Sequence, residues 1–118
     1  MSQQLEIRFH LFGKDVRDLC LKLKKDVINI EYIKQVIRSS GSVGANYIEA
    51  AENLGVNDER MKLKIARREV KETCHWLDYL LTYDDENLEQ VRLQLLNEGD
   101  QINKILSKII LNVENRPK

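Results

Sequence analysis

The sequence contains almost no residue that interrupts a helix. Its 118 residues include five glycines and a single proline, Pro117, near the C-terminal end. Proline inside a helix removes a hydrogen bond and clashes with the preceding turn, so its absence from the interior leaves every long segment free to be helical. Apolar and polar residues nowhere alternate with the two-residue period of a half-buried strand. These absences favour an all-α fold.

Signals for a membrane or an oxidising compartment are also lacking. No apolar run approaches the length of about 18 residues that a membrane-spanning helix needs. The N-terminal segment lacks the positive region, apolar block and small-residue cleavage site of a secretory signal. The two cysteines, Cys20 and Cys74, form no CxxC pair. We therefore expect reduced thiols in a cytoplasmic protein with no membrane partner.

Neither sign of charge is in excess, because 19 Lys and Arg residues balance 19 Asp and Glu residues. Charged residues make up 32 % of the chain and hydrophobic residues 42 %, as in folded domains. Nucleic-acid-binding domains are usually strongly basic, so this balance argues against a generic nucleic-acid coat. A net charge near zero favours self-association.

What the sequence does contain is four segments of helical period. Apolar residues recur at three- and four-residue steps within residues 9–26, 32–53, 58–83 and 87–113. Short connections between four such helices predict one domain over residues 1–118, an antiparallel up-down-up-down four-helix bundle. The third and fourth segments carry more apolar surface than one core needs, which favours cover by a second copy and hence a homo-oligomer.

Turn and cap residues separate these segments. Gly55 is expected just after the C-terminal end of the second helix. Asn57 or Asp58 is expected to be the N-cap of the third helix, and Asp84 or Asp85 that of the fourth.

The stretch "RSSGSVGANYIEAAE" at residues 38–52 places small residues in the middle of a helix. Ser40 and Gly44 share one face of that helix, and Gly41 and Ala45 share another. Glycine inside a helix costs about 1 kcal/mol relative to alanine, so a compensating role is expected. Close approach of a neighbouring backbone and a kink at one of the glycines both fit the pattern.

Two carboxylates interrupt the apolar and aromatic line of the third segment. Glu69 and Glu72 lie on the face that also carries Trp76 and Tyr79. A carboxylate near a core needs a charged or hydrogen-bonding partner, and Arg38 is a natural one. We predict a polar cluster where the second and third helices cross, made of Arg38, Asn46, Glu49, Glu69 and Glu72. A network that fixes helix register, a ligand or metal site, and a partly solvated surface are its three interpretations.

No catalytic or metal-binding pattern is complete. Glu72 and His75 form one Glu-x-x-His, whereas a di-metal bundle needs two such pairs and further glutamates. A Gly-rich phosphate loop and a Ser-His-Asp pattern are both missing. We therefore expect no catalytic residue, no cofactor, no metal and no enzymatic activity.

Positive charge gathers in the segment "RMKLKIARREVK". One stripe of residues at steps of four, three and four consists of Arg60, Lys64, Arg67 and Lys71, with Lys62 and Arg68 to its sides. Such a stripe attracts phosphates, although an ordinary solvated helix face has the same composition. In a ring of subunits the stripe would repeat once per subunit and add avidity.

Two motifs resemble the 23S rRNA-intervening sequence protein family. One is the Arg-Ser-Ser-x-Ser-x-x-x-Asn-x-x-Glu pattern that starts at Arg38 and ends at Glu49, and the other is "KIARREVKETCHWLDYLL". The resemblance covers residues 12–111. It implies an antiparallel four-helix bundle that assembles as a ring-shaped homopentamer and is not an established enzyme. A related branch, the accessory protein of diversity-generating retroelements, binds a reverse transcriptase and nucleic acid through a positively charged barrel.

Three hypotheses of function follow. The first is a non-enzymatic, homo-oligomeric accessory factor that binds RNA, DNA or a ribonucleoprotein enzyme through the basic stripe. The second is a protein-interaction scaffold without direct nucleic-acid contact, which the neutral charge favours. The third is an enzyme or ligand carrier that uses Glu69 and Glu72.

Overall fold

The computed structural model describes residues 1–117, which form four helices joined by short connections. Helix α1 spans Gln3–Lys22, α2 spans Val27–Ala51, α3 spans Val56–Tyr79 and α4 spans Glu86–Glu114. These described residues include no strand. The chain is therefore all-α, as the sequence predicts.

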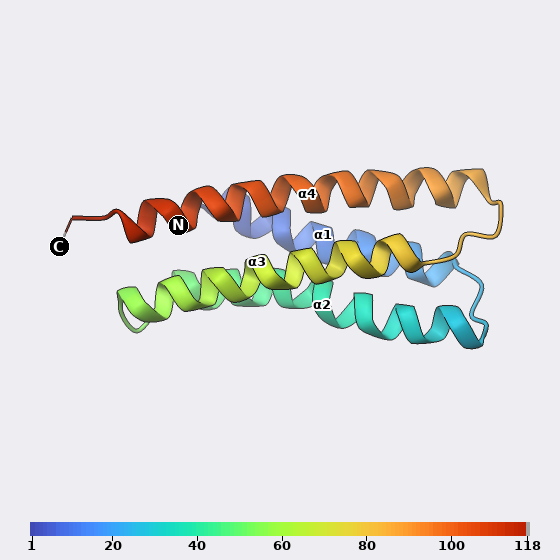
Figure 1. The fold of residues 1–118 in the computed structure, drawn as a ribbon, viewed down its shortest axis with the longest axis horizontal. Helices are drawn as coiled ribbons and strands as arrows, with labels where there is room; N and C mark the ends of the chain where they lie inside the picture. Colours follow the sequence, from blue (N-terminus) through green and yellow to red (C-terminus); the bar gives the residue numbers. More distant parts are fainter. Residues whose placement is uncertain (118) are drawn as a thin grey trace.

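The helices enclose one elongated core. Helices α1 and α3 each pack against both α2 and α4. Figure 1 shows all four lying along the long axis of a molecule of 53 × 21 × 20 Å, with both chain termini at the same end. Every helix contributes apolar side chains that are almost completely buried between them: Phe9, Phe12, Val16, Val36, Val43, Tyr47, Leu63, Val70, Leu77, Ile102, Leu106 and Ile110.

Polar N-caps define where three of the helices begin. The side chains of Ser2, Asp26 and Asp85 accept hydrogen bonds from backbone N–H groups of the following turn, at 3.2, 2.8 and 3.0 Å. Such caps satisfy donors that have no partner within the helix. As a result α1 begins at residue 3 rather than 9, and α2 begins at residue 27 rather than 32. The C-terminal end of α1 also differs, at residue 22 rather than 26. Asp85 was one of the two caps expected for α4.

The bounds of α3 also differ from the prediction. Gly55 is the N-cap of α3 rather than the residue just after the C-cap of α2. Its φ of 138° suits glycine. Asn57 and Asp58 lie inside the first turn instead of capping it. At its other end α3 stops at Tyr79 rather than at Tyr83, which has a φ of 50° in the connection to α4.

One buried amide holds two connections together at the end of the bundle. Asn29 is completely buried, and its Nδ2 donates to the carbonyl oxygens of Lys24 at 3.0 Å and of Leu81 at 2.9 Å. Its Oδ1 accepts from the N–H of Leu81 at 3.0 Å. These bonds satisfy three backbone groups, so the amide ties the α1–α2 connection to the α3–α4 connection.

The small residues of α2 permit close contact with α1. A Cβ added at Gly44 would lie 3.6 Å from the backbone of Phe9 and His10, and one added at Gly13 would lie 3.4 Å from the carbonyl oxygen of Ser40. Gly41, by contrast, has no neighbouring atom within 4 Å of such a Cβ. Close approach of α1 therefore accounts for Gly44, whereas packing gives no reason for Gly41.

We expect Gly41→Ala to raise the free energy of unfolding by about 1 kcal/mol, because alanine favours the helix and meets no neighbour. Gly99→Ala is the matched control. Its new methyl group would overlap the sulfur of Cys74, so this variant should lose stability. Urea titrations followed by circular dichroism measure both changes. A loss of stability in Gly41→Ala would contradict the helical, unobstructed setting of this residue.

Candidate functional site

An arginine on α2 joins the two carboxylates of α3. The guanidinium of Arg38 lies 3.1 Å from Glu69 Oε2 and 2.7 Å from Glu72 Oε1. The Glu69 side chain is only 11 % exposed, whereas Glu72 is 35 % exposed. The hydrogen bond from Arg38, with a smaller contribution from the Trp76 indole, lowers the pKa of Glu72 below its usual range. The pairing keeps charge at the edge of the core, with the strongest desolvation at Glu69.

A buried hydrogen bond lies beside this ion pair. The Thr73 hydroxyl donates to the Ser39 hydroxyl at 2.8 Å, and both side chains are completely buried. Each hydroxyl also lies near a backbone carbonyl of its own helix. A shift of α3 along α2 would break the contact between the hydroxyls and leave each with only the carbonyl of its own helix. The contact therefore fixes the register of α3 against α2.

Asn46 and Glu49 lie outside the Arg38 cluster. Asn46 Nδ2 donates to the carbonyl oxygen of Ser42 at 2.8 Å within α2, and Glu49 lies 3.7 Å from Lys62 Nζ. Asn46 is eight positions after Arg38, or about 12 Å along the helix axis, which explains the separation. Of the five residues predicted to gather here, the structure brings together Arg38, Glu69 and Glu72.

The predicted basic stripe lies on α3 and faces α4 over part of its length. Arg60 and Lys64 lie 3.8 and 3.3 Å from the carboxylate of Glu114, and Arg67 donates to the Ser107 hydroxyl at 3.3 Å. Arg60 and Lys64 thus share one α4 carboxylate, whereas Arg67 has a hydroxyl partner there. Lys71, the fourth, is exposed and forms no ion pair within residues 1–117.

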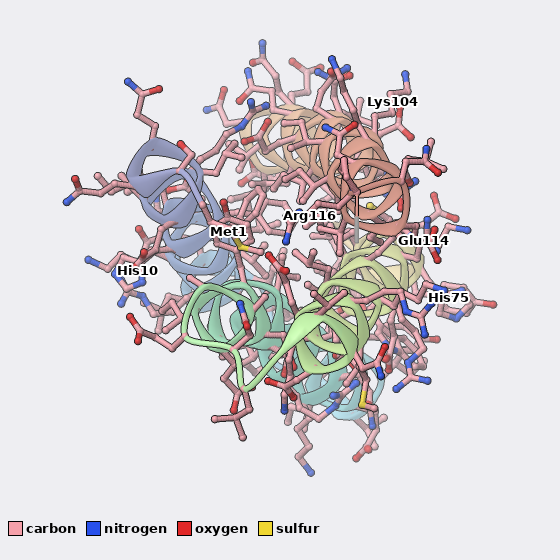
Figure 2. The ribbon with its side chains drawn as sticks, turned by 90° about the vertical axis from the view of Figure 1, so that its left-hand side faces the viewer. Met1, His10, His75, Lys104, Glu114 and Arg116 are labelled. Atoms are coloured by element: carbon pink, nitrogen blue, oxygen red, sulfur yellow. The ribbon has the colours of Figure 1, made fainter. Side chains whose placement is uncertain are left out.

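Arg68 likewise has no carboxylate partner among the described residues, and it is exposed. Arg68, Lys71, His75 and Tyr79 follow one another at steps of three, four and four, so they form one line on the helix. We call these four residues the α3 outer face. Figure 2 shows His75 on the outer side of α3, away from the core.

Aromatic rings gather at the Tyr79 end of the α3 outer face. The His75 ring lies 4.6 Å from Tyr79 and 4.8 Å from Trp76, between centroids. Tyr32 of α2 completes the group, with its ring 6.0 Å from Trp76 and stacked on it, and 5.5 Å from Tyr79. Tyr79 retains 46 % exposure. The group therefore bridges α2 and α3 and still presents ring surface to solvent.

Sequence reasoning missed Tyr32 and treated Arg68 as a flank of the stripe. Tyr32 precedes Ser39 by seven residues, or about two helical turns, which places both on the side of α2 that meets α3. That spacing was a usable signal. The role of Arg68 depends instead on which cations find partners on α4, and one chain segment does not contain that information.

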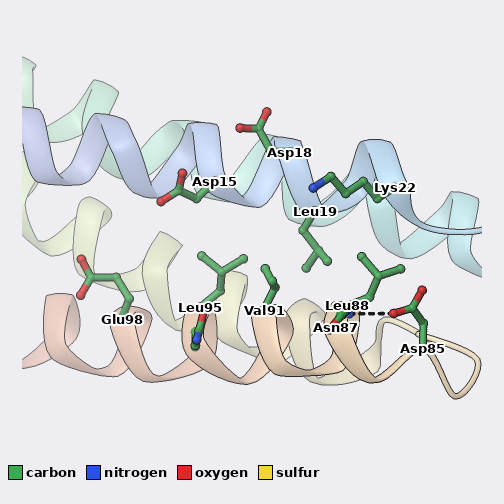
Figure 3. A pocket seen from close by; sticks show the side chains of 11 residues that line it. Asp15, Asp18, Leu19, Lys22, Asp85, Asn87, Leu88, Val91, Leu95 and Glu98 are labelled. Carbon is green, nitrogen blue, oxygen red and sulfur yellow. Dashed lines mark hydrogen bonds between the residues drawn. The ribbon is translucent and has the colours of Figure 1, made fainter.

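A second surface feature is a groove between α1 and α4. Its floor is apolar, formed by Leu19, Leu88, Val91 and Leu95. Its rim is mainly acidic, with the carboxylates of Asp15, Asp18, Asp85 and Glu98 and one cation, Lys22. Figure 3 shows the leucine and valine side chains between the two helices and Asp15 and Asp18 on the α1 side. Arg8 of α1 binds Glu98 through two hydrogen bonds of 2.8 and 2.7 Å. Such a groove suits an apolar segment with basic edges.

Reactive chemistry has little support in the described part of the chain. Burial raises the pKa of Cys20 to about 11 and also raises the pKa of Cys74, so both thiols stay protonated near neutral pH. No group of three or more His, Cys, Asp or Glu side chains within residues 1–117 is placed to hold a metal ion. No helix there is long and apolar enough to cross a bilayer.

Comparison with known proteins relates this arrangement to one family. The model of the 23S rRNA-intervening sequence protein family matches residues 8–108. This chain belongs to that family. The Arg38 cluster and the α3 outer face described above are therefore features of a 23S rRNA-intervening sequence protein. None of the curated proteins matches the chain.

A solved structure agrees with this membership of the 23S rRNA-intervening sequence protein family. It is the crystal structure of a protein with unknown function from the S23 ribosomal protein family of Bacteroides thetaiotaomicron. The two chains are 30 % identical and superpose with a TM-score of 0.75 over 89 % of this chain and 96 % of the other. Neither description indicates an enzyme family.

The unequal burial of the two glutamates predicts unequal effects of mutation. We expect Arg38→Met to lower the free energy of unfolding by about 1–3 kcal/mol, because it leaves the nearly buried Glu69 carboxylate without its partner. Glu72→Ala should cost less than about 1 kcal/mol, since Glu72 is partly solvated and Arg38 keeps Glu69. Chemical denaturation at pH 7 measures both. Equal effects would contradict the assignment of the buried role to Glu69.

Proposed function

We propose that this protein is a non-enzymatic, cytoplasmic accessory factor that binds nucleic acid or a ribonucleoprotein through the α3 outer face. In this proposal the helices form an antiparallel up-down-up-down bundle, and copies of it assemble into a ring-shaped homo-oligomer, with five subunits by family resemblance. The observation that carries the proposal is the pair of exposed cations on α3, Arg68 and Lys71, that have no carboxylate partner in residues 1–117.

Local charge supports phosphate binding even though the whole chain is neutral. A shallow hollow on α3 is lined by Asn57, Arg60, Met61, Lys64, Ile65, Arg67, Arg68 and Lys71, with no acidic residue among them. Phosphates respond to charge within about 10 Å at moderate salt, so this local excess counts more than the distant acids. Each neutralised phosphate would release counterions and favour binding.

Assembly would multiply a weak contact. Large apolar side chains remain exposed on several helices, including Leu11 on α1 and Ile37 and Ile48 on α2, at 48 %, 43 % and 44 % exposure. Contact with other copies would cover such side chains. A ring would present the α3 outer face once per subunit, and several weak phosphate contacts on one nucleic-acid strand would then add as avidity.

The nucleic-acid proposal predicts a specific loss on charge reversal. Fluorescence anisotropy with labelled RNA of about 20 nucleotides should show binding that weakens steeply between about 50 and 200 mM salt. Arg68→Glu/Lys71→Glu should weaken binding at least about tenfold and reduce the salt slope by about two. Lys14→Glu/Lys108→Glu, on α1 and α4, is the matched control, because it changes net charge equally and should leave most of the affinity. Equal losses in both variants would contradict a localised site.

The oligomer proposal predicts a definite mass. Native mass spectrometry of the full chain should show one species at about five times the protomer mass of 13.8 kDa. A dilution series then separates a stable ring from concentration-driven association, since a ring keeps its mass. A protein that remains at 13.8 kDa throughout the series would contradict assembly and would remove the avidity from the argument above.

The groove between α1 and α4 favours a second candidate function, a protein-interaction scaffold without nucleic-acid contact. Its apolar floor and acidic rim suit a basic amphipathic segment of another protein. The RNA titration separates the two functions, because a scaffold of this kind ignores RNA even at low salt. Failure of RNA binding in a correctly assembled protein would make the scaffold the preferred function.

A further inference from the structure

Aromatic rings lie beside Arg68 and Lys71, and phosphate binding alone does not require them. Four rings from two helices, those of Tyr32, His75, Trp76 and Tyr79, form a continuous set with neighbouring centroids 4.6–6.0 Å apart. Tyr32 covers one side of Trp76 by stacking on it. Tyr79 and His75 are the members that face solvent. A set built only to hold α2 against α3 has no need of these two exposed rings.

The exposed rings continue the line of cations. His75 and Tyr79 lie four and eight positions after Lys71, hence one and about two turns further along the same line of α3. The four side chains from Arg68 to Tyr79 extend over about 16 Å of helix axis. Cations that track a backbone, followed by rings on which bases stack, are the combination that binds single-stranded nucleic acid.

Neighbouring acidic side chains are already engaged. Glu72 lies between the cations and the rings in sequence, but Arg38 and the Trp76 indole both hydrogen-bond its carboxylate. Asp78, on the α4 side, lies 3.8 Å from Arg92. Arg38 therefore partly neutralises Glu72, which opposes an incoming phosphate less strongly, whereas Asp78 stays 73 % exposed and only weakly paired.

We propose that the α3 outer face is a binding site for single-stranded RNA, in which Arg68 and Lys71 contact phosphates and unpaired bases stack on His75 and Tyr79. This inference rests on the proposed nucleic-acid function and adds the class of ligand. The site spans about five nucleotides at the phosphate spacing of about 3.4 Å in a stacked strand. Duplex RNA lacks free base faces, so the site discriminates against it.

The test uses the single tryptophan of the chain, Trp76, as a local reporter. The full-length protein is titrated with a single-stranded RNA of about 12 nucleotides and with a duplex of equal length, at low salt. Single strands should quench the emission of Trp76 and bind more tightly than the duplex. Tyr79→Leu should weaken single-strand binding about fivefold to 100-fold, with an unchanged salt slope, while Tyr79→Phe keeps the ring and the affinity.

The possible outcomes distinguish a failure of this inference from a failure of the proposed nucleic-acid-binding function. Salt-dependent binding that is equal for single strand and duplex, and unaffected by Tyr79→Leu, overturns the stacking site and leaves the phosphate-binding function intact. Absence of any binding by the wild-type protein at low salt overturns both. Because Tyr79 is about half exposed, Tyr79→Leu should fold, and circular dichroism verifies this; His75→Leu is a second variant with the same expected loss.

Discussion

The hydrogen bond between Thr73 and Ser39, completely buried between α3 and α2, constrains the rest of the surface. It favours one relative position of the two helices, because any other breaks this contact inside the core. The ion pair from Arg38 to Glu69 reinforces the same position from the rim. With α3 in this register, the residues on the side of the helix opposite the core face solvent.

This register explains why the cations of α3 are not equivalent. Those that lie toward α4 meet Glu114 and Ser107, and their charge or hydrogen-bonding capacity is used within the molecule. Arg68 and Lys71 are exposed and have no carboxylate partner among residues 1–117, so their charge stays available. A protein with no net charge thus carries a local positive surface, as the weak, avidity-dependent contacts proposed above require.

The same register positions the aromatic residues. Trp76 turns toward α2 and stacks on Tyr32, so it is held firmly and still hydrogen-bonds Glu72. His75, one position before Trp76, and Tyr79, three positions after it, are exposed; Figure 2 shows His75 on the outer side of α3. In the proposed site, the rings would supply the geometry for stacking and the neighbouring cations the attraction for phosphates.

Much of the fold could be predicted from the sequence. The helical period and the absence of interior proline gave four helices, and the spacing of Glu69 and Glu72 correctly indicated a pairing with Arg38. Helix ends were less accurate, because Ser2 and Asp26 cap helices before the apolar period starts. The local sequence pattern indicates that a helix is present, whereas the exact ends of a helix depend on single capping hydrogen bonds.

The candidate site was harder to predict because it depends on contacts between helices. Spacing alone placed Arg60, Lys64, Arg67 and Lys71 in one stripe, and only their partners on α4 distinguish the last from the first three. In the same way, the full set of rings required Tyr32 from another helix. Asn46 and Glu49 have chemistry that suits the Arg38 cluster. They lie about two and three helical turns along α2 from Arg38, so they do not join it.

Photo-crosslinking is the measurement that tests the central claim most directly. Single-stranded RNA containing 4-thiouridine is irradiated with the assembled protein, and the crosslinked peptides are identified by mass spectrometry. The account predicts crosslinks at His75, Trp76 or Tyr79, with loss of those crosslinks in Arg68→Glu/Lys71→Glu. Crosslinks confined to α1 or α4, in protein that binds the RNA, would contradict the assignment of the binding surface to α3.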